Sequence, residues 1–523
     1  MQVMVDGSLL EVDDAEIAWV CSVMGLPSNA FDPIGEDDSR RSAIRNFGTM
    51  DFEACPGSGK TTLLVAKLAI LANKWKTRRQ GICVLSHTNA ARSEIGTRLS
   101  TCSAGSALLQ YPHFVGTIHS FVNEFLATPW IRSKNLPVKV IDTDIALNKR
   151  WFKLPPPTRT YLERQNLSKH ALEYTRVDFG GGSKGNLGEL TETYKKMVAI
   201  GQITSNDGYF CYDEMFVWAH ELLDLRPDVI PFLRSRFPYV FIDEAQDNSE
   251  LQSGLLRRLF SEGEKPSVRQ RFGDSNQAIY QYASQKGAQT DVFPGNNKCD
   301  LPRSYRFGHV IADLAKPLGI TPQELVGAGP PGLIATAHLR TPTLFLFDDA
   351  TVTQVLPHYG QLLMEAFNSD ELSKGKFFAV SGVHSAELKP PIPRTMEHYE
   401  PNYSATTAKQ YTTLDTFSQF LGRARCNMIG NDNTHHLVNA VALATLRLAQ
   451  LVDETFEVAK RHNSHRYVRE LLAEHEALPS YQALVTFVIE RKGMFAEVEW
   501  NGAFADLAFA VTKAITGKSG RSR

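Results

Sequence analysis

The chain has 523 residues, of which 43% are hydrophobic and 22% are charged. This composition is typical of a soluble globular protein, and the length predicts two to four domains, each with its own core. The 56 basic and 57 acidic residues nearly cancel, which excludes a globally basic nucleic-acid-binding protein and leaves a local groove as the place for any such surface.

The cysteines and the apolar segments indicate the cellular compartment in which the protein works. The seven cysteines are odd in number and scattered, without a C-x-x-C pair, which argues against a disulfide framework and a structural zinc site. We find no apolar run long enough to cross a bilayer, and the first residues lack the features of a secretory signal. We therefore expect a cytoplasmic protein that does not act at a membrane.

In chain order, residues 1–50 are predicted to form a helical lead-in, after which short apolar strands alternate with helices. Strands are expected at 50–54, 82–86 and 114–116, and helices at 61–72, 89–99 and 119–126. This alternation predicts a parallel sheet covered by helices. A polar, mostly helical insertion is expected at 127–205, and strand signals return at 239–242 and near Phe272.

The region after about residue 301 has a different pattern. Strand-like segments are expected at 343–347 and 377–383, and the pattern is helical from residue 435. The predicted fold class is α/β. The predicted domains are the lead-in at 1–50, an α/β domain formed by 51–126 and 206–300, the helical insertion at 127–205, and a second, partial domain with a helical C-terminal region at 301–523.

The most specific local pattern lies between the first expected strand and its helix. It reads Ala54-Cys55-Pro56-Gly57-Ser58-Gly59-Lys60-Thr61-Thr62. Glycines let backbone N–H groups close around phosphate oxygens, and the helix N-terminus adds partial positive charge. In such a P-loop, Lys60 reaches the β and γ phosphates and the Thr61 hydroxyl binds Mg²⁺. The alternative is an ordinary Gly/Ser turn before a helix, and an alanine at the first position weakens the pattern.

Two adjacent carboxylates follow a second apolar strand, at Asp243 and Glu244. Asp243 would hold the metal ion, while Glu244 would orient and deprotonate the water that attacks the γ-phosphate. An acidic pair of this kind is by itself more often a solvated strand end. Its combination with Lys60 in a parallel-sheet context favours a nucleotide-hydrolysing site. Cys55, at the start of the loop, is expected to carry a thiolate stabilised by the helix N-terminus, which nucleotide would protect from alkylation.

Six segments in a fixed order resemble the motifs of superfamily 1 DNA helicases of the UvrD/Rep type. Besides the P-loop and the segment at 243–247, the matching segments lie at 84–91, 115–121, 273–280 and 301–306. Together they span residues 54–306. The resemblance implies a RecA-like ATPase core that uses ATP and Mg²⁺, and translocation on single-stranded DNA in the 3′ to 5′ direction.

The same resemblance implies roles for individual residues outside the P-loop. Gln277 would sense the γ-phosphate, Arg306 would stabilise charge on the transferring phosphoryl group, and Tyr305 would stack on adenine. The residues implied to contact the DNA strand are Thr88, Asn89, Thr117, His119 and Tyr282. Any one of these side chains alone would more simply be explained by packing, so the inference depends on their co-occurrence.

Three features depart from the family pattern. The glutamine motif that reads adenine is missing, and residues 38–43 occupy that stretch. The strand before Gly273 carries Arg269 and Arg271, which are unusual in a buried parallel strand unless they lie at an edge or meet a charged partner. The late motifs of the second motor domain are not recognisable, so we expect an incomplete second RecA-like region.

The sequence therefore predicts an ATP-dependent DNA helicase or translocase with DNA-stimulated ATP hydrolysis. Its expected partners are single-stranded or junction DNA and a protein that would complete the motor. One alternative is a nucleotide-gated DNA-binding sensor subunit without unwinding activity, for example in an anti-phage defence complex. A second alternative is an RNA helicase of the same superfamily, which competition between the two nucleic acids would distinguish.

Overall fold

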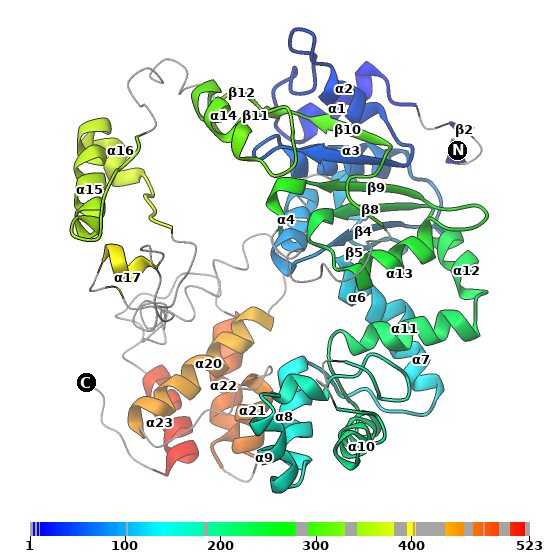
Figure 1. Ribbon diagram of the computed structural model, residues 1–523, viewed down its shortest axis with the longest axis vertical. Coiled ribbons are helices and arrows are strands. Elements are labelled where there is room, and N and C mark those ends of the chain that lie inside the picture. Colours follow the sequence, from blue (N-terminus) through cyan, green and yellow to red (C-terminus); the bar gives the residue numbers. More distant parts are fainter. Residues whose placement is uncertain are drawn as a thin grey trace. The chain divides into compact units, whose positions relative to one another are not determined.

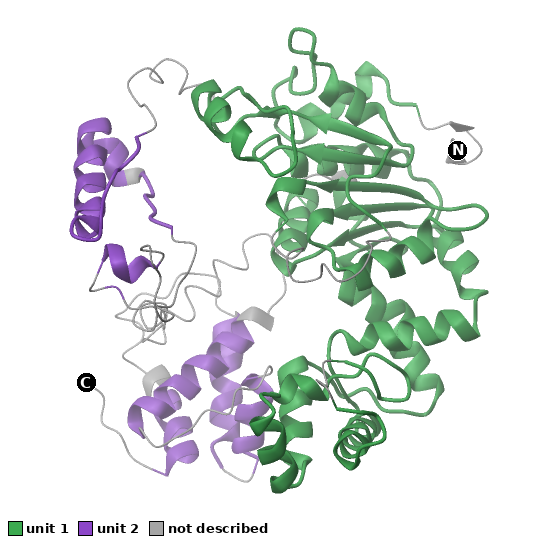
Figure 2. Cartoon of the chain, viewed as in Figure 1, with its two compact units in different colours: residues 1–337 green, residues 338–523 purple. Residues whose placement is uncertain are grey.

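The computed structural model divides the chain into two compact units, residues 1–337 and 338–523 (Figure 2). It describes residues 4–5, 8–9, 11–100, 103–182, 187–278, 291–329, 343–380, 395–400, 403, 435–453, 464–473, 476–490 and 503–517. Among the helices in these ranges, none has the length and apolar character that a membrane span requires.

The first unit is built on a six-stranded sheet in which every neighbouring pair of strands is parallel (Figure 1). The strands are β3 (Met50–Ala54), β4 (Ile82–Ser86), β5 (Phe114–Thr117), β8 (Tyr239–Asp243), β9 (Val268–Gly273) and β10 (Lys298–Leu301), in the spatial order β10-β3-β9-β8-β4-β5. The strands predicted at 50–54 and 82–86 are confirmed at the same residues. Because the strands are parallel, all their carboxyl ends meet at one edge of the sheet.

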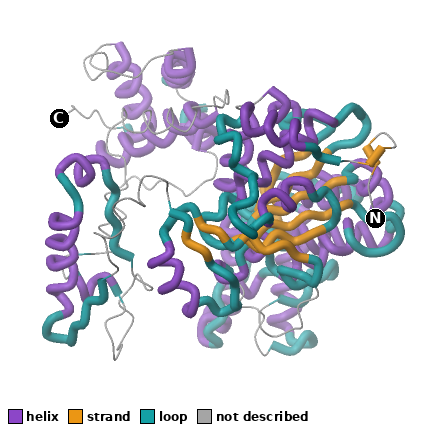
Figure 3. The backbone as a smooth tube through the Cα atoms, turned by 90° about the horizontal axis from the view of Figure 1, so that it is seen from above, coloured by secondary structure: helices purple, strands orange, loops and turns teal. Residues whose placement is uncertain are grey.

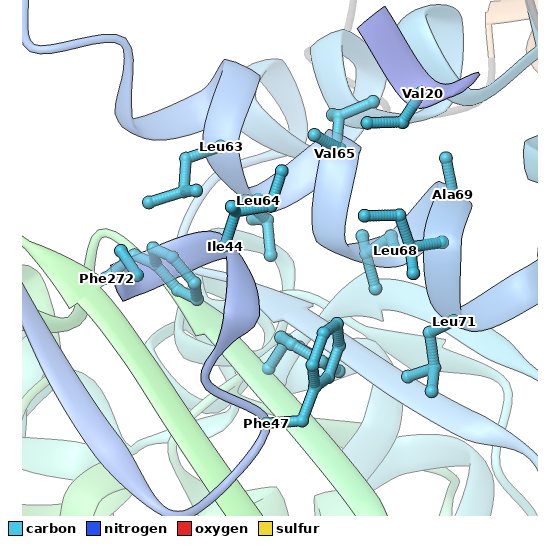
Figure 4. Packing of buried hydrophobic residues seen from close by; sticks show 14 of the residues in the cluster. Val20, Ile44, Phe47, Leu63, Leu64, Val65, Leu68, Ala69, Leu71 and Phe272 are labelled. Carbon is cyan, nitrogen blue, oxygen red and sulfur yellow. The ribbon is translucent and has the colours of Figure 1, made fainter. Parts of the chain in front are cut away.

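Alternate residues of these strands face two separate cores, as the two-residue period of a strand requires. Val84 and Phe241 lie in the core that includes helix α3 (Lys60–Lys74), whereas Leu85 and Ile242 lie in the opposite one. Figure 4 shows the first core, in which Leu64 and Leu68 of α3 pack near Ile44, Phe47 and Phe272. With both faces covered, β4 and β8 are largely apolar runs. Figure 3 shows the strands running between helices.

The helices around the sheet contribute to these two cores. The first core includes residues of α1 (Asp14–Val23), α2 (Ser39–Arg45), α3 and α4 (Asn89–Ser100), with α5 (Ser103–Ala107) next to α3 and α4. The second includes residues of α6 (Ile118–Val122), η1 (Asn123–Ala127), α7 (Thr128–Ser133), α11 (Glu214–Leu225), α12 (Val229–Arg236) and α13 (Glu250–Phe260). A small hairpin, β1 (Met4–Val5) and β2 (Ser8–Leu9), precedes them.

The predicted insertion, residues 127–205, contains helices and a core of its own. Its further elements are β6 (Val140–Ile141), α8 (Thr143–Lys153), α9 (Pro156–Arg164) and α10 (Glu192–Asn206), and β6 pairs with β7 (Tyr209–Phe210). A fully buried ion pair joins Arg150 of α8 to Glu214 of α11. Glu214 also accepts a hydrogen bond from the Cys211 backbone N–H at 2.8 Å, so this carboxylate ties α8 to the start of α11.

The two arginines of β9 lie in the middle of the sheet rather than at its edge. Arg271 donates two hydrogen bonds to Asp51 of β3, at 2.8 and 2.5 Å, and lies 3.1 Å from Asp291. Arg269 is paired with the same Asp291 at 2.6 Å. All four side chains are buried or nearly so, with no more than 10% exposed. Of the two explanations that the sequence left open, the charged contact is correct.

The sequence expectations for the region after residue 301 are only partly met. In the first unit this region contains β11 (Arg303–Ser304), β12 (Val326–Gly327) and α14 (His309–Ala315). The α-helices among the described residues of the second unit are α15 (Val355–Ala366), α16 (Ser369–Lys374), α17 (Met396–Tyr399), α20 (His435–Val452), α21 (Ser464–Leu471), α22 (Leu478–Glu490) and α23 (Ala503–Thr516).

The strand predicted at 343–347 is wrong, and so is the described part, 377–380, of the strand predicted at 377–383. Both segments expose large apolar side chains, including Leu346 at 88% and Val380 at 92%. Their apolar character therefore does not reflect burial in a sheet. The domain boundaries drawn from the sequence remain a prediction.

Candidate active site

The P-loop joins the end of β3 to the start of α3. Gly57 and Gly59 have φ angles of +80° and +77°, in the left-handed region that glycine adopts without a Cβ clash. Lys60 is the first residue of α3, so the first backbone N–H groups of the helix point toward the loop. The arrangement is that of an anion-binding helix N-terminus.

Gly57 is also the point where the chain after β11 contacts the loop. The Tyr305 backbone N–H donates to the Gly57 carbonyl at 2.9 Å, and the Ser304 hydroxyl donates to the Pro56 carbonyl at 2.7 Å. A Cβ on Gly57 would lie only 2.5 Å from the Arg306 Cβ. These contacts hold Tyr305 and Arg306 against the P-loop.

The two carboxylates at the end of β8 occupy different environments. Asp243 is 1% exposed, and burial raises the pKa of its carboxyl to about 6, although the positive charge of Lys60 opposes the shift. Glu244 lies 2.5 Å from the Lys60 Nζ. Burial would raise the pKa of Glu244, but Lys60 and a hydrogen bond from Gln246 outweigh burial and hold that pKa below its ordinary value.

A chain of side-chain amides and carboxylates links Glu244 to the segment after β9. Gln246 donates from Nε2 to the Glu244 carboxylate at 2.8 Å, and its Oε1 accepts the Asp274 backbone N–H at 3.0 Å. Gln277 in turn donates to the Asp274 carboxylate at 2.7 Å. Hydrogen bonds therefore connect Glu244, the candidate general base, to Gln277, the candidate γ-phosphate sensor.

These groups surround one cavity of about 520 Å³. It is lined by residues 54–62 and by Glu94, Arg98, Glu244, Gln277, Tyr305 and Arg306. The structure thus brings the predicted P-loop, the general-base candidate, the sensor, the stacking tyrosine and the arginine together in one site. Asp243, the buried last residue of β8, is not among the residues that line this cavity.

A divalent cation fits the residues at the base of this cavity. One carboxylate oxygen of Asp243, Oδ1, is buried without a hydrogen-bond partner among the described residues. Thr61 lines the cavity with its hydroxyl-bearing side chain. Carboxylate and hydroxyl oxygens are ligands that Mg²⁺ accepts, and the ion otherwise keeps waters and substrate phosphates. No cluster of three or more His, Cys, Asp or Glu ligands occurs in the described part of the chain.

Four of the five residues predicted to contact DNA lie at the same edge of the sheet, at the ends of β4 and β5. Thr88 and Asn89 are exposed at the start of α4. The Thr117 hydroxyl caps α6 by accepting the Ser120 N–H at 3.1 Å, and the half-buried His119 lies 3.6 Å from Asp213. Tyr282 lies outside the described residues.

Sequence reasoning missed several residues of the cavity. Arg98 of α4 donates to the Thr62 hydroxyl at 3.0 Å and pairs with Glu94 at 2.7 Å. Neither residue belongs to a recognisable motif, because helical packing alone brings them to the loop. Gln246, which stands inside the Asp-Glu-Ala-Gln-Asp segment, could have been identified from the sequence.

The thiolate expected at Cys55 is contradicted by the structure. Cys55 is only 4% exposed, and burial, followed by the negative charge of Asp274, raises the pKa of its thiol to about 12. Removal from water therefore outweighs the helix N-terminus. A protonated thiol of this kind does not report on nucleotide binding by alkylation.

A parallel sheet with a P-loop after one strand and a carboxylate pair after another defines a RecA-like P-loop NTPase domain. Comparison with known families agrees: residues 37–294 match the UvrD/REP helicase N-terminal domain. The resemblance to UvrD/Rep-like helicases that the motifs carry is therefore confirmed for this part of the chain.

Individual relatives point to the same family. The chain is 27% identical over 301 residues to DNA helicase II of Salmonella typhimurium, a match that covers 54% of this chain and 40% of the relative. It is 27% identical over 281 residues to DNA helicase II of Escherichia coli, covering 50% and 37%. The ATP-dependent DNA helicase PcrA of Staphylococcus aureus is 24% identical over 296 residues, covering 51% and 37%. The chain thus spans about two fifths of the length of these curated relatives.

Proposed function

We propose that the chain is an ATP-dependent DNA translocase or helicase whose hydrolytic site is the cavity around Lys60 and Glu244. The observation that supports this most directly is the convergence of Lys60, Glu244, Gln277, Tyr305 and Arg306 on one cavity. The relatives named as DNA helicases supply the substrate class.

The chemistry follows from the positions of these side chains. The P-loop amides and Lys60 bind the phosphates, which draws Lys60 away from Glu244. Glu244 then orients the attacking water and takes its proton, and Gln277 contacts the γ-phosphate. Arg306 stabilises the charge that develops on the transferring phosphoryl group. Thr61 and Asp243 would hold Mg²⁺, which would supply positive charge to offset that of the phosphates.

Helix α4 connects the nucleotide cavity to the residues that are predicted to contact DNA. Its first residue, Asn89, belongs to the predicted strand-contacting group, while Glu94 and Arg98 farther along the same helix line the nucleotide cavity. A shift of α4 when phosphate enters or leaves would therefore move the predicted DNA contacts. This connection supports DNA-stimulated hydrolysis by the chain.

The DNA half of the proposal is tested by steady-state ATP hydrolysis with single-stranded DNA or RNA, and by unwinding of duplexes with a 3′ or a 5′ tail. We expect stimulation by DNA and unwinding of the 3′-tailed duplex. His119→Ala should raise the DNA concentration needed for half-maximal stimulation, whereas His170→Ala, at an exposed histidine of the insertion, should not. Equal stimulation by RNA and DNA, or none by either, would contradict the assignment.

A further inference from the structure

The turn that carries Gln277 is held by a segment that lies 45 residues farther along the chain. This turn is η4 (Ser275–Gln277), which follows β9, and we call residues 319–323 the strap. The Asn276 side chain donates from Nδ2 to the Thr321 carbonyl at 2.9 Å and accepts the Thr321 N–H on Oδ1 at 2.9 Å. Gly319 packs against the same amide, since a Cβ there would lie 3.3 Å from Nδ2. These two reciprocal hydrogen bonds fix the turn against the strap.

A second contact joins the strap to the start of the same turn. The Gln323 Nε2 donates to the Ser275 hydroxyl at 3.0 Å and to the Glu53 carboxylate of β3 at 2.7 Å. Glu53 is only 3% exposed, and the Ser275 hydroxyl donates to it as well. Hydrogen bonds to a buried carboxylate are stronger than the same bonds in water, and their loss costs more. Gln323 therefore anchors the strap to β3 and to η4 at one point.

Beyond Gln323, the chain continues into the segment that borders the nucleotide cavity. It forms β12, which pairs with β11 in parallel, and the Ala328 N–H donates to the Ser304 carbonyl at 2.7 Å. Ser304 directly precedes Tyr305 and Arg306, which line the cavity. The strap is therefore anchored on the same part of the chain that carries Arg306.

The strap contacts are placed to act through Gln277 rather than on the nucleotide. Gln277 lines the nucleotide cavity, whereas Asn276 and Gln323 are not among the lining residues. The Gln277 Nε2 donates to Asp274 at 2.7 Å, and the Asn276 backbone N–H donates to the other oxygen of the same carboxylate at 3.0 Å. A shift of the turn at Asn276 would therefore disturb the contact that holds the Gln277 side chain.

We propose that Asn276 and Gln323 are positioning residues, which hold the turn against the strap so that Gln277 stays at the nucleotide cavity. The inference rests on the proposed function, because that function assigns Gln277 to the γ-phosphate. ATP has this phosphate and ADP lacks it. The strap would therefore set how well the site distinguishes ATP from ADP and how fast the γ-phosphate is transferred, while the P-loop sets the affinity for the phosphates that both nucleotides share.

The variants that test this are Asn276→Ala and Gln323→Met in the full-length chain. Methionine keeps roughly the length of glutamine but removes the amide donor. Glu53 retains its ion pair with Lys298 at 2.9 Å, so Gln323→Met leaves no unpaired buried charge. Glu324→Gln is the matched control, because Glu324 directly follows the strap and its exposed side chain pairs only with Lys316 among the described residues.

Two measurements are made on each protein. Calorimetry gives Kd for ADP and for the non-hydrolysable β,γ-imido analogue of ATP, and steady-state assays give kcat with single-stranded DNA. Both strap variants should bind ADP as wild type does, lose the preference for the analogue over ADP, and show a kcat roughly tenfold to a hundredfold lower. Glu324→Gln should match wild type in all three quantities.

A double variant separates positioning of Gln277 from a general loss of structure. In a Gln277→Ala background, Gln323→Met should cause little further loss of kcat or of discrimination, because the side chain that it positions is gone. Additive losses in the two backgrounds would overturn the inference. Equal weakening of ADP and the analogue, or wild-type discrimination in both strap variants, would overturn it as well.

Failure of the proposed function would look different. Wild type would then bind the analogue but hydrolyse no ATP in the presence of DNA. The binding measurement still decides the inference in that case. Loss of discrimination in Asn276→Ala and Gln323→Met would support the strap although the hydrolytic proposal had failed, and retained discrimination would overturn the strap too.

Discussion

Lys60 and Glu244 form an ion pair of 2.5 Å inside the candidate active site. In the proposed mechanism this lysine binds phosphate and this carboxylate activates water, so the ion pair joins the two groups on which hydrolysis would depend. Glu244 has a φ of +52°, an unfavourable angle for a residue with a Cβ, and such strain is found where the surrounding structure enforces a functional position. In the proposed mechanism, phosphate binding would replace this pair with a lysine–phosphate contact and release Glu244 toward water.

This exchange predicts opposite effects of Glu244→Gln on binding and on hydrolysis. The neutral amide no longer competes for Lys60, so ATP should bind at least as tightly as in wild type, while hydrolysis falls at least about a hundredfold through loss of the general base. Equilibrium titration with a fluorescent ATP analogue, followed by single-turnover hydrolysis, measures both. Weaker binding in Glu244→Gln would show that the ion pair organises the site rather than restraining it.

The contact between Gly57 and Arg306 predicts a local effect of Gly57→Ala. The added Cβ would sit 2.5 Å from the Arg306 Cβ, so Arg306 and Tyr305 must move, and kcat/KM should fall roughly tenfold to a hundredfold. Gly263→Ala is the control, because Gly263 has a φ of +79° but its added Cβ would meet only the flexible end of Arg234, at 3.6 Å. Equal kinetic losses in the two variants would mean that backbone strain, not the contact, is responsible.

The buried charges between β3 and β9 predict a large loss of stability in Arg271→Met. Removing the arginine leaves Asp51 buried without its cation, which should lower the free energy of unfolding by about 3 kcal/mol. The double variant Asp51→Leu/Arg271→Met should lose less than Arg271→Met alone, because no unpaired charge remains. Chemical denaturation measures each value. Arg226→Met, in an exposed pair, should cost much less than Arg271→Met, and equal losses in the two variants would contradict the account.

His113 predicts a pH dependence of stability in the acidic range. Burial lowers the pKa of its imidazole to about 4, and its Nδ1 accepts the Ile82 backbone N–H at 3.1 Å. The unfolded chain binds a proton near pH 6.5, whereas the folded chain resists it until about pH 4, so this residue's stabilisation is lost as pH falls through that window. His113→Asn, which keeps an acceptor but does not titrate, should show a smaller loss of unfolding free energy between pH 6.5 and 4. Parallel pH profiles for the two proteins would exclude this role.

Much of the first unit could be predicted from the sequence because its signals are local. The strand at 82–86 is a short apolar run followed by a helix, and the strand at 50–54 leads into a P-loop with a fixed spacing. Apart from Glu94 and Arg98, the residues that line the cavity also lie in recognisable segments. In a parallel sheet, such segments meet at one edge whatever the distance between them in the chain.

The remainder depends on packing between distant segments, which no local pattern encodes. Asp51, the partner of Arg271, lies 220 residues before it in the chain. The guanidinium of Arg40 lies over the Tyr305 ring, a contact that no motif near Arg40 predicts. The thiolate expected at Cys55 was wrong because burial decided its protonation. The strand expected at 343–347 was wrong because apolar residues there are exposed, so their pattern carries no information about a core.

The central claim is that Lys60 and Glu244 are two halves of one ATP-hydrolysing site that responds to DNA. The most direct measurement is steady-state ATP hydrolysis with Mg²⁺ by the purified chain, with and without single-stranded DNA, beside Lys60→Ala and Glu244→Gln. We predict hydrolysis that rises with DNA in wild type and is lost in both variants. Hydrolysis that survives either substitution, or that is absent in wild type although ATP binds, would contradict the claim.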